Sequence, residues 1–296
     1  MRLLIACLFA LALSACAHLK GVSQGDASRG EPLTAMTYNI RLDLASDGAN
    51  AWPNRRDMAI ALIGHEAPDV IGMQEVLLGQ MNDLKAGLSG YRLVGVGRDD
   101  GGEGGEFSPI GWREDRFVLV DWGTFWLSDT PAVPGLGWDA AYPRIATWAL
   151  LRDRRNGRVL RVLNTHLDNN GETARARGAA LILRWAREGE GADSDTPTVI
   201  MGDFNAPPGS TPYSILTGAG SDGLLDSRTA SATPPYGPGG TFNGFDIESD
   251  SGTPIDHIFV SPGIAVDGYS VITQQWGGRL PSDHYPVKVQ LRLPAR

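Results

Sequence analysis

The sequence predicts an α/β fold in which mixed β-sheets pack face to face and helices cover their outer faces. Apolar runs typical of buried strands alternate with helical stretches along the chain. Several neighbouring strands are joined by short turns, such as the one at Asn156-Gly157, which indicates antiparallel hairpins within the sheets. The 296 residues contain no internal repeat or low-complexity block, so they suit one large domain or two ordinary ones.

Residues 1–16 have the order of features typical of a bacterial lipoprotein signal. Arg2 precedes an apolar run that is too short to span a bilayer, and Leu13-Ser14-Ala15-Cys16 resembles a lipobox. We expect cleavage before Cys16 and acylation of that residue. Ordinary signal cleavage at a neighbouring alanine and a buried N-terminal helix are the alternatives. Residues 17–31 are rich in Gly, Ser, Asp and Lys, which predicts a flexible tether.

These features predict an exported protein, either secreted or lipid-anchored on the periplasmic side of the cell envelope (at the outer membrane in a Gram-negative host). Cys7 and Cys16 are the only cysteines, so the processed chain would contain no disulfide and no cysteine metal site. The net charge of −8 has the opposite sign to that of most nucleic-acid-binding proteins and disfavours long duplex DNA as a partner.

In the first half of the chain, a helix with an apolar inner face is expected at 55–65, with Asn54 as its N-cap. A second, shorter helix is expected at 80–88. Buried or alternating apolar runs predict strands at 33–42, 69–75, 91–97, 107–113 and 117–127. The Gly-rich, acidic stretch 99–106 and the Pro- and Trp-containing stretch 128–142 are expected to be loops.

In the second half, residues 144–151 and 158–165 are expected to pair across the Asn156-Gly157 turn. Arginines cluster at this hairpin, and we interpret them as a solvated turn rather than a nucleic-acid surface. An amphipathic helix is expected at 173–188 and a short helix at 210–216. Further strands are expected at 198–201, 255–260, 269–273 and 287–293, with a Pro- and Gly-rich loop at 231–245.

The apolar run at 198–201 stops abruptly at Gly202-Asp203-Phe204-Asn205. Pro207-Pro208-Gly209 forbids a continuing strand, so Asp203 and Asn205 should lie at the carboxyl end of a central strand, where α/β sheets usually place their chemistry. An ordinary turn is the alternative, because Gly, Asp and Asn are common turn residues.

Polar residues suited to chemistry recur at the ends of the predicted strands. Each of them alone could be a turn or capping residue, but their regular recurrence favours a shared site. These residues are Asn39, Glu75, His166, Asp203, Asn205, Asp256, His257, Asp283 and His284.

Six ordered segments carry a specific resemblance. They are Tyr38-Asn39-Ile40, Gln74-Glu75, Asn164-Thr165-His166-Leu167-Asp168, Gly202-Asp203-Phe204-Asn205, Ile255-Asp256-His257-Ile258-Phe259 and Ser282-Asp283-His284-Tyr285-Pro286. Their order resembles that of the endonuclease/exonuclease/phosphatase (DNase I-like) superfamily, which includes nucleases, sphingomyelinases and inositol polyphosphate phosphatases. The resemblance covers most of residues 32–296 and implies one catalytic domain there, a four-layer α/β sandwich. Two further segments, 125–128 and 143–148, resemble a bacterial secreted branch.

The resemblance implies a divalent cation, usually Mg²⁺ with Mn²⁺ possible, held by Asn39, Glu75 and Asp283. Oxygen ligands of this kind suit a hard ion, which would neutralise charge on a phosphoryl group. The number of metal ions stays open.

By the same resemblance, Asp203 orients or deprotonates the attacking water, while Asn205 positions the phosphate. His166 donates to a non-bridging oxygen, and His284, held by Asp256, contacts the phosphate or transfers a proton. Whether Asp203 or His284 is the general base stays open.

Three residues stand apart from the shared pattern. Arg41 replaces a second acid found in some abasic-site endonucleases, which weakens a DNA-repair interpretation. His257 replaces an aromatic residue and is expected to change only packing. Arg144 is a candidate phosphate clamp, because a guanidinium can bind phosphate through two N–H groups; a structural role is the alternative.

The predicted function is therefore metal-assisted in-line hydrolysis of a phosphomonoester or phosphodiester by a monomer. The substrate could be a sugar phosphate, an inositol phosphate, a phospholipid or a nucleic acid. A dinuclear zinc or iron phosphoesterase is less favoured, because it predicts a histidine after Gly202-Asp203. A non-catalytic binding lipoprotein with a decayed site predicts missing catalytic groups, and none is missing.

Overall fold

The computed structural model describes residues 30–188, 193, 195–218, 223–249 and 252–294. The predicted signal peptide and nearly all of the predicted tether lie outside these residues, and the first strand already begins at Glu31. None of the helices in the described residues is both long enough and apolar enough to cross a membrane.

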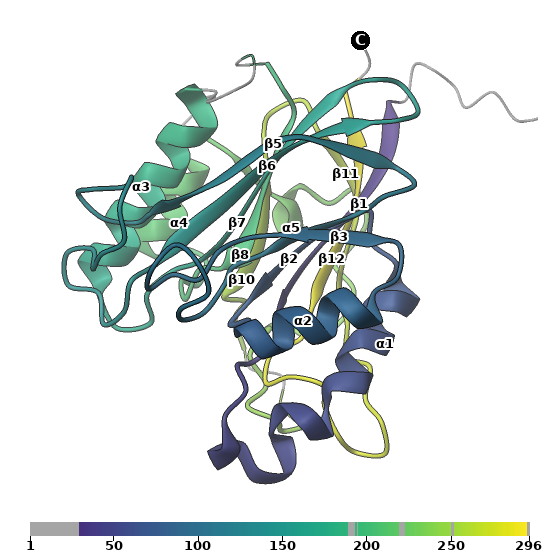
Figure 1. The fold of residues 1–296 in the computed structure, drawn as a ribbon. Coiled ribbons are helices and arrows are strands. Elements are labelled where there is room, and N and C mark those ends of the chain that lie inside the picture. The colour runs from purple at the N-terminus through teal and green to yellow at the C-terminus, as the bar shows by residue number, and fades with distance from the viewer. Residues whose placement is uncertain (1–29, 189–192, 194, 219–222, 250–251, 295–296) are drawn as a thin grey trace, which may run out of the picture.

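Two six-stranded mixed sheets form the centre of the molecule, as predicted (Figure 1). In each sheet one central pair of strands is parallel, β1 with β2 and β7 with β8, and the other pairs are antiparallel. The first sheet has the order β11 (Ala265–Val271), β12 (Val287–Leu293), β1 (Glu31–Asn39), β2 (Val70–Gln74), β4 (Ile110–Arg113), β3 (Tyr91–Val94). The second has the order β5 (Phe117–Trp126), β6 (Ile145–Asp153), β7 (Val159–His166), β8 (Thr198–Asp203), β10 (Asp256–Val260), β9 (Leu225–Asp226).

Helices cover the outer faces of both sheets, so the domain has four layers (Figure 1). The first sheet packs against α1 (Arg56–Glu66) and α2 (Leu78–Gly87), and the second packs against α3 (Glu172–Glu188) and α4 (Thr211–Thr217). Short turns complete the elements: η2 (Ala45–Asn50), η3 (Trp52–Asn54) and α5 (Ser227–Ala230).

Three apolar clusters correspond to the spaces between these layers. The largest lies between the sheets, and residues such as Ala35, Val162 and Met201 in it are fully buried. The other two lie beneath the helices on either side, one around Ile63 and Met73 and one around Ile182, Ile200 and Phe259. Burial of this much apolar surface is the main driving force for the fold.

Buried polar contacts also tie the two sheets together. The Asn164 side chain donates to the carbonyls of Met73 and Pro109 at 2.7 and 2.9 Å and accepts from Gln74 at 2.6 Å. A Cβ at Gly72 would lie only 2.5 Å from Asn164 Oδ1, so glycine is needed where these strands approach. Asn164, which belongs to one of the six sequence segments, therefore has a structural role.

One local prediction was wrong. Arg55 rather than Asn54 precedes α1, and no side chain caps the helix; the Asn54 amide donates instead to the carbonyl of Gly48. Arg161, on the second strand of the 144–165 hairpin, is buried and donates to the carbonyls of Trp185 and Ala186. A cation at the carboxyl end of α3 is favoured by the helix dipole, which explains its burial there. The hairpin itself forms as predicted.

Candidate active site

The topology brings the predicted site residues to one edge of the two sheets. Strands β1, β2, β7 and β8 end at this edge, and the antiparallel strands β10 and β12 begin there. Asp256 is paired with Asp203 in the ladder between β10 and β8. The Ser282 hydroxyl donates to the carbonyl of Asn39 at 2.7 Å, which ties the segment before β12 to the end of β1. Of the nine polar residues predicted at strand ends, six line a pocket of about 640 Å³, namely Glu75, His166, Asp203, Asn205, Asp283 and His284. Asp256 and Asn39 contact residues that line it, and His257 lies outside this group.

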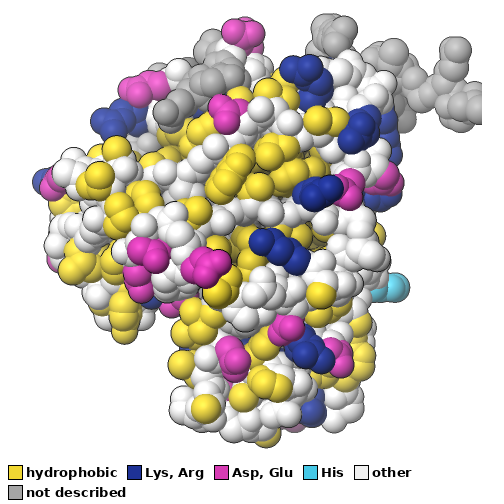
Figure 2. All heavy atoms as spheres, viewed as in Figure 1, with side chains coloured by type: hydrophobic (Ala, Val, Ile, Leu, Met, Phe, Trp, Pro, Cys, Tyr) yellow, Lys and Arg dark blue, Asp and Glu magenta, His cyan; other side chains and the backbone are white. Residues whose placement is uncertain are grey.

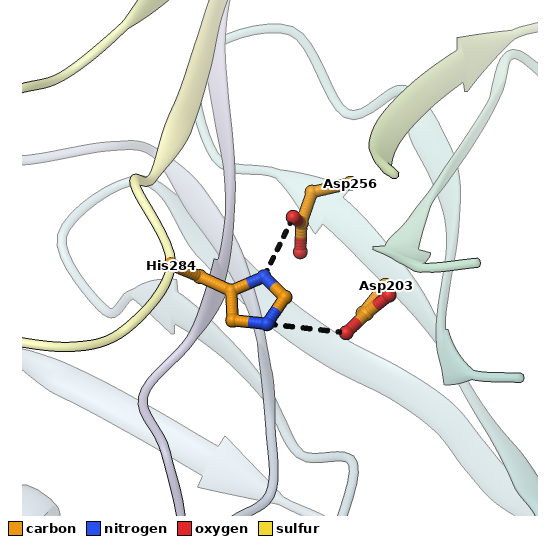
Figure 3. Close-up of side chains that lie close together, drawn as sticks. All are labelled: Asp203, Asp256 and His284. Atoms are coloured by element: carbon orange, nitrogen blue, oxygen red, sulfur yellow. Dashed lines mark hydrogen bonds and ion pairs between the residues drawn. The ribbon is translucent and has the colours of Figure 1, made fainter. Parts of the chain in front are cut away.

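His284 lies between two buried carboxylates (Figure 3). Its Nδ1 is hydrogen-bonded to Asp256 Oδ2 at 2.8 Å, and its Nε2 lies 3.7 Å from Asp203 Oδ2. The potential ligand atoms of the three residues lie within 4.8 Å of one another. Because Nδ1 is used by Asp256, the imidazole presents only Nε2 toward Asp203 and the pocket.

The surroundings of these groups perturb their protonation. Burial alone would lower the pKa of His284, but the charge and hydrogen bond of Asp256, together with Asp203 and Asp283, raise it to about 10. Burial, reinforced by the nearby Asp256 charge, raises the pKa of Asp203 to about 7. His284 is therefore a cation at neutral pH, and Asp203 can exchange a proton near neutrality.

Asn39 links Asp203 to Glu75 at a second wall of the pocket. Its Nδ2 donates to Glu75 Oε1 and to Asp203 Oδ2, both at 3.0 Å, while its Oδ1 accepts the Arg41 backbone N–H at 3.0 Å. The Arg41 N–H can only donate, so this network fixes which end of the amide faces the carboxylates. Asn39 thus positions Glu75 in this structure, and its expected role as a metal ligand stays a prediction.

Glu75 and Asp283 supply the oxygen atoms of this wall that suit a hard divalent cation. Glu75 accepts hydrogen bonds from Asn39 and from the Leu42 backbone N–H. Asp283 Oδ1 lies 3.3 Å from the Ser282 hydroxyl oxygen, and burial raises the pKa of Asp283, with Glu75 adding to the effect. These two carboxylates, which both line the pocket, fit the chemistry of a Mg²⁺ or Mn²⁺ site.

Backbone strain is concentrated at the same edge. Arg41, Glu75 and Asn205 have positive φ values of 58°, 61° and 46°, which non-glycine residues rarely adopt. Conformations of this kind persist only where the surrounding structure holds them, and they cluster at functional sites. Here Glu75 follows β2 directly, and Arg41 and Asn205 lie two residues beyond the ends of β1 and β8; all three side chains line the pocket.

His166 and Asn205 form the wall nearest β7. The Asn205 amide donates to the Leu167 carbonyl at 3.0 Å and lies 3.2 Å from His166 Nε2. Burial, with the charges of Arg144, Arg98 and His284, holds the pKa of His166 well below its usual value, so the ring is neutral. If Nε2 accepts from Asn205, its proton lies on Nδ1, which faces Glu106 Oε2 at 3.7 Å. Donation by His166 to a substrate oxygen, and phosphate positioning by Asn205, stay predictions.

A second group of side chains comes from loops, and sequence reasoning missed most of it. Arg98 pairs with Glu106 at 2.8 Å, and the Arg98 guanidinium lies 5.0 Å from the centre of the Tyr142 ring. The Phe242 ring packs edge-on against His284 at 5.2 Å. The loop stretches containing Glu106, Tyr142 and Phe242 were expected, but nothing in the sequence indicated that these side chains face the pocket. We call Arg98, Glu106, Tyr142, Arg144 and Phe242 the loop rim.

Arg144 has a narrower role than the sequence suggested. Its Nε donates to Asp168 at 3.2 Å and its Nη2 to Asn169 at 3.1 Å, which leaves only Nη1 without a partner. The side chain also lies against Tyr142, with the guanidinium 5.7 Å from the ring centre. Arg144 therefore lines the pocket, but its guanidinium does not offer two free nitrogen atoms to bind a phosphate there. His257 packs among Phe204, Tyr213 and Phe259 and faces the Ala206 carbonyl, as the packing interpretation predicted.

Residues 36–284 match the profile of the Endonuclease/Exonuclease/phosphatase family. The chain belongs to this family. It is similar to mannosyl-6-phosphatase Bt3783 of Bacteroides thetaiotaomicron VPI-5482, with 39% identity, a TM-score of 0.84, and coverage of 88% of this chain and 99% of that one. A second family protein from Bacteroides thetaiotaomicron is 38% identical, with a TM-score of 0.84 and coverage of 89% and 96%.

The matches to curated relatives are partial. Drosophila melanogaster Nocturnin is 26% identical over 69% of this chain, and the match spans 34% of its length. An uncharacterised protein of Acanthamoeba polyphaga mimivirus is 28% identical over 52% of this chain and 59% of its own length. Family membership and the fold together point to phosphoric ester hydrolysis.

Proposed function

We propose that the protein is a divalent-metal-dependent phosphatase that hydrolyses a phosphomonoester, with sugar phosphates as the preferred class. The observation that carries this proposal is the His284–Asp256 pair facing Asp203, in one pocket with the carboxylates of Glu75 and Asp283. The sugar-phosphate preference is supported by the 39% identity to a mannosyl-6-phosphatase over 99% of that chain.

Asp203, His284 and Asp256 would have different roles in hydrolysis, which follow from their charge and position. Asp203 is the group best placed to orient a water molecule and take its proton, because its pKa of about 7 matches the operating pH of a general base. His284 is cationic and offers an N–H from Nε2, so it suits stabilisation of charge on the phosphoryl oxygens. Asp256 accepts the other N–H of His284 and thereby fixes the orientation of the ring.

Glu75 and Asp283 would hold the cation, with Asn39 fixing Glu75. When bound, Mg²⁺ or Mn²⁺ would neutralise charge on the phosphoryl group and on the departing oxygen. Oxygen ligands without a cysteine or a direct histidine favour a hard ion over zinc.

Two alternatives are less well supported. A nuclease acting on DNA or RNA would benefit from a basic surface, but the net charge is −8. Figure 2 shows Lys and Arg side chains singly or beside acidic ones, with no continuous basic patch among the described residues of that face. A binding lipoprotein with a decayed site is disfavoured, because the catalytic groups are present and lie close together.

Hydrolysis assays on matched substrates test the proposal. We expect phosphate release from p-nitrophenyl phosphate and sugar 6-phosphates to exceed cleavage of bis-p-nitrophenyl phosphate and single-stranded oligonucleotides. Faster cleavage of oligonucleotides would instead establish the nuclease alternative. Absence of hydrolysis for every substrate, in a folded protein supplied with Mg²⁺, would favour the decayed binding protein.

We also propose that the protein is exported and anchored through an acylated Cys16. The support is the order of Arg2, the apolar run and Leu13-Ser14-Ala15-Cys16, all of which lie outside the described residues. Mass spectrometry of the protein from its native host should find a mature chain that begins at lipid-modified Cys16. A chain that retains Met1 would contradict the proposal.

A further inference from the structure

Arg41 is fixed beside the carboxylates that the proposed function assigns to the cation. Its Nη1 lies 4.0 Å from Glu75 Oε2, and its Nε lies 3.8 Å from Asp283 Oδ2. The side chain lines the pocket and is 27% exposed, so it is neither a core residue nor a freely solvated one.

Several contacts prevent Arg41 from moving away. Its Nε and Nη2 donate to the two carboxylate oxygens of Asp47, each at 3.0 Å, in a two-pronged ion pair. Its backbone N–H donates to Asn39, and its carbonyl accepts from Arg55 at 2.6 Å and from Gln80 at 2.8 Å. Hydrogen bonds at both the N–H and the carbonyl of Arg41 therefore stabilise its strained positive φ of 58°.

This arrangement has an electrostatic consequence. Any metal cation bound by both Glu75 and Asp283 would lie close to the Arg41 guanidinium, which is fixed about 4 Å from each of these carboxylates. An arginine stays charged at every accessible pH, so the repulsion cannot be removed by deprotonation. Without a metal, the same guanidinium offsets the mutual repulsion of the two carboxylates.

We propose that Arg41 is a built-in counter-cation that stabilises the Glu75–Asp283 pair without metal and lowers its affinity for divalent cations. This inference rests on the proposed metal site but concerns a residue that is not part of it. Arg41 is a positioning residue, because it acts on the ligands rather than on the substrate.

Direct measurement of Mn²⁺ binding to chelator-treated protein, by electron paramagnetic resonance, tests the proposal without an activity assay. Arg41→Gln should bind Mn²⁺ about tenfold more tightly than the wild type, the size expected for removing one charge several ångströms from a dication in a solvated pocket. In EDTA the variant should melt about 2–4 °C lower, and Mn²⁺ should raise its melting temperature more than that of the wild type.

Arg41→Lys is the matched control, because it loses the two-pronged contact with Asp47 but keeps a cation at this position. It should not tighten Mn²⁺ binding. Arg56→Gln removes one charge from an exposed Arg–Asp pair and should leave the affinity unchanged. If Arg41→Gln binds Mn²⁺ no more tightly than the wild type, or if Arg41→Lys tightens binding equally, the role of Arg41 is overturned while the metal site stands. If neither the wild type nor Arg41→Gln binds Mn²⁺, the metal site of the proposed function fails as well.

Discussion

The pocket has two parts that are built in different ways. Strand ends and the segment before β12 provide one part, which we call the strand-end floor and which consists of Asn39, Glu75, His166, Asp203, Asp256, Asp283 and His284. Side chains of the floor are tied to one another by buried hydrogen bonds and anchored to backbone ladders. The loop rim is held instead by pairs such as Arg98–Glu106 and by stacking on Tyr142.

This difference separates two tasks. Residues anchored to strands are held precisely enough for chemistry, since small displacements of catalytic groups cost large factors in rate. Loop residues can change without disturbing the sheets, so they suit the choice of substrate. We therefore expect substitutions in the floor to lower kcat and substitutions in the rim to change mainly KM.

The largest effect is expected for Asp203→Asn, which retains the side-chain volume but removes charge and basicity. Loss of a general base should lower kcat by about 10²–10⁴-fold. The melting temperature should stay the same or rise, because a buried carboxylate near Asp256 is neutralised. If the variant keeps more than a tenth of wild-type kcat, the assigned role is wrong, and joint loss of activity and folding would make Asp203 structural.

A smaller, graded loss is expected within the His284–Asp256 pair. His284→Ala should lower kcat by about 10²-fold or more, because a charged donor toward the phosphoryl oxygens is lost. Asp256→Asn should cost less, about tenfold, since it only alters the orientation and charge of the ring. The measurement is kcat for both variants, each paired with its melting temperature. Equal losses would mean that the two residues act as one inseparable unit.

In the rim, Arg144→Gln should raise KM about tenfold and leave kcat within about threefold, as expected for one charged hydrogen bond to bound phosphate. Tyr142→Phe is the matched control, because the ring that lies against Arg98 and Arg144 is retained. A kcat loss at Arg144 comparable to that of Asp203→Asn would remove the distinction between rim and floor.

The smallest effect concerns the pH dependence of stability in metal-free protein. The folded pKa of Asp203 is raised to about 7, so its contribution is full below about pH 4 and is lost as the pH rises through 7. The folded pKa of His284 is raised to about 10, so its contribution is full below about pH 6.5 and is lost as the pH rises through 10. Urea unfolding at pH 4, 6.5 and 10.5 should show both decreases, and Asp203→Asn should lack most of the first. An unchanged profile in that variant would contradict the raised pKa.

The sequence predicted the floor because strand burial and strand ends leave local signals. Runs such as Val199-Ile200-Met201 mark buried strands, and the polar residue that follows each of them is fixed at the sheet edge. The rim leaves no such signal, because the contact of Glu106 with Arg98 and its approach to His166 depend on how a glycine-rich loop folds. The position of the Arg41 side chain could not be predicted either, because it depends on a strained backbone turn and on the contact with Asp47.

The central claim is that phosphate release depends on a cation held at Glu75. Phosphate release from p-nitrophenyl phosphate should be measured for chelator-treated wild type and Glu75→Gln during a Mg²⁺ titration. The account predicts no release without metal, recovery of the wild type with Mg²⁺, and little or no recovery of Glu75→Gln at the same concentrations, although it folds. Full activity of the wild type in metal-free buffer, or wild-type recovery by Glu75→Gln, would contradict it.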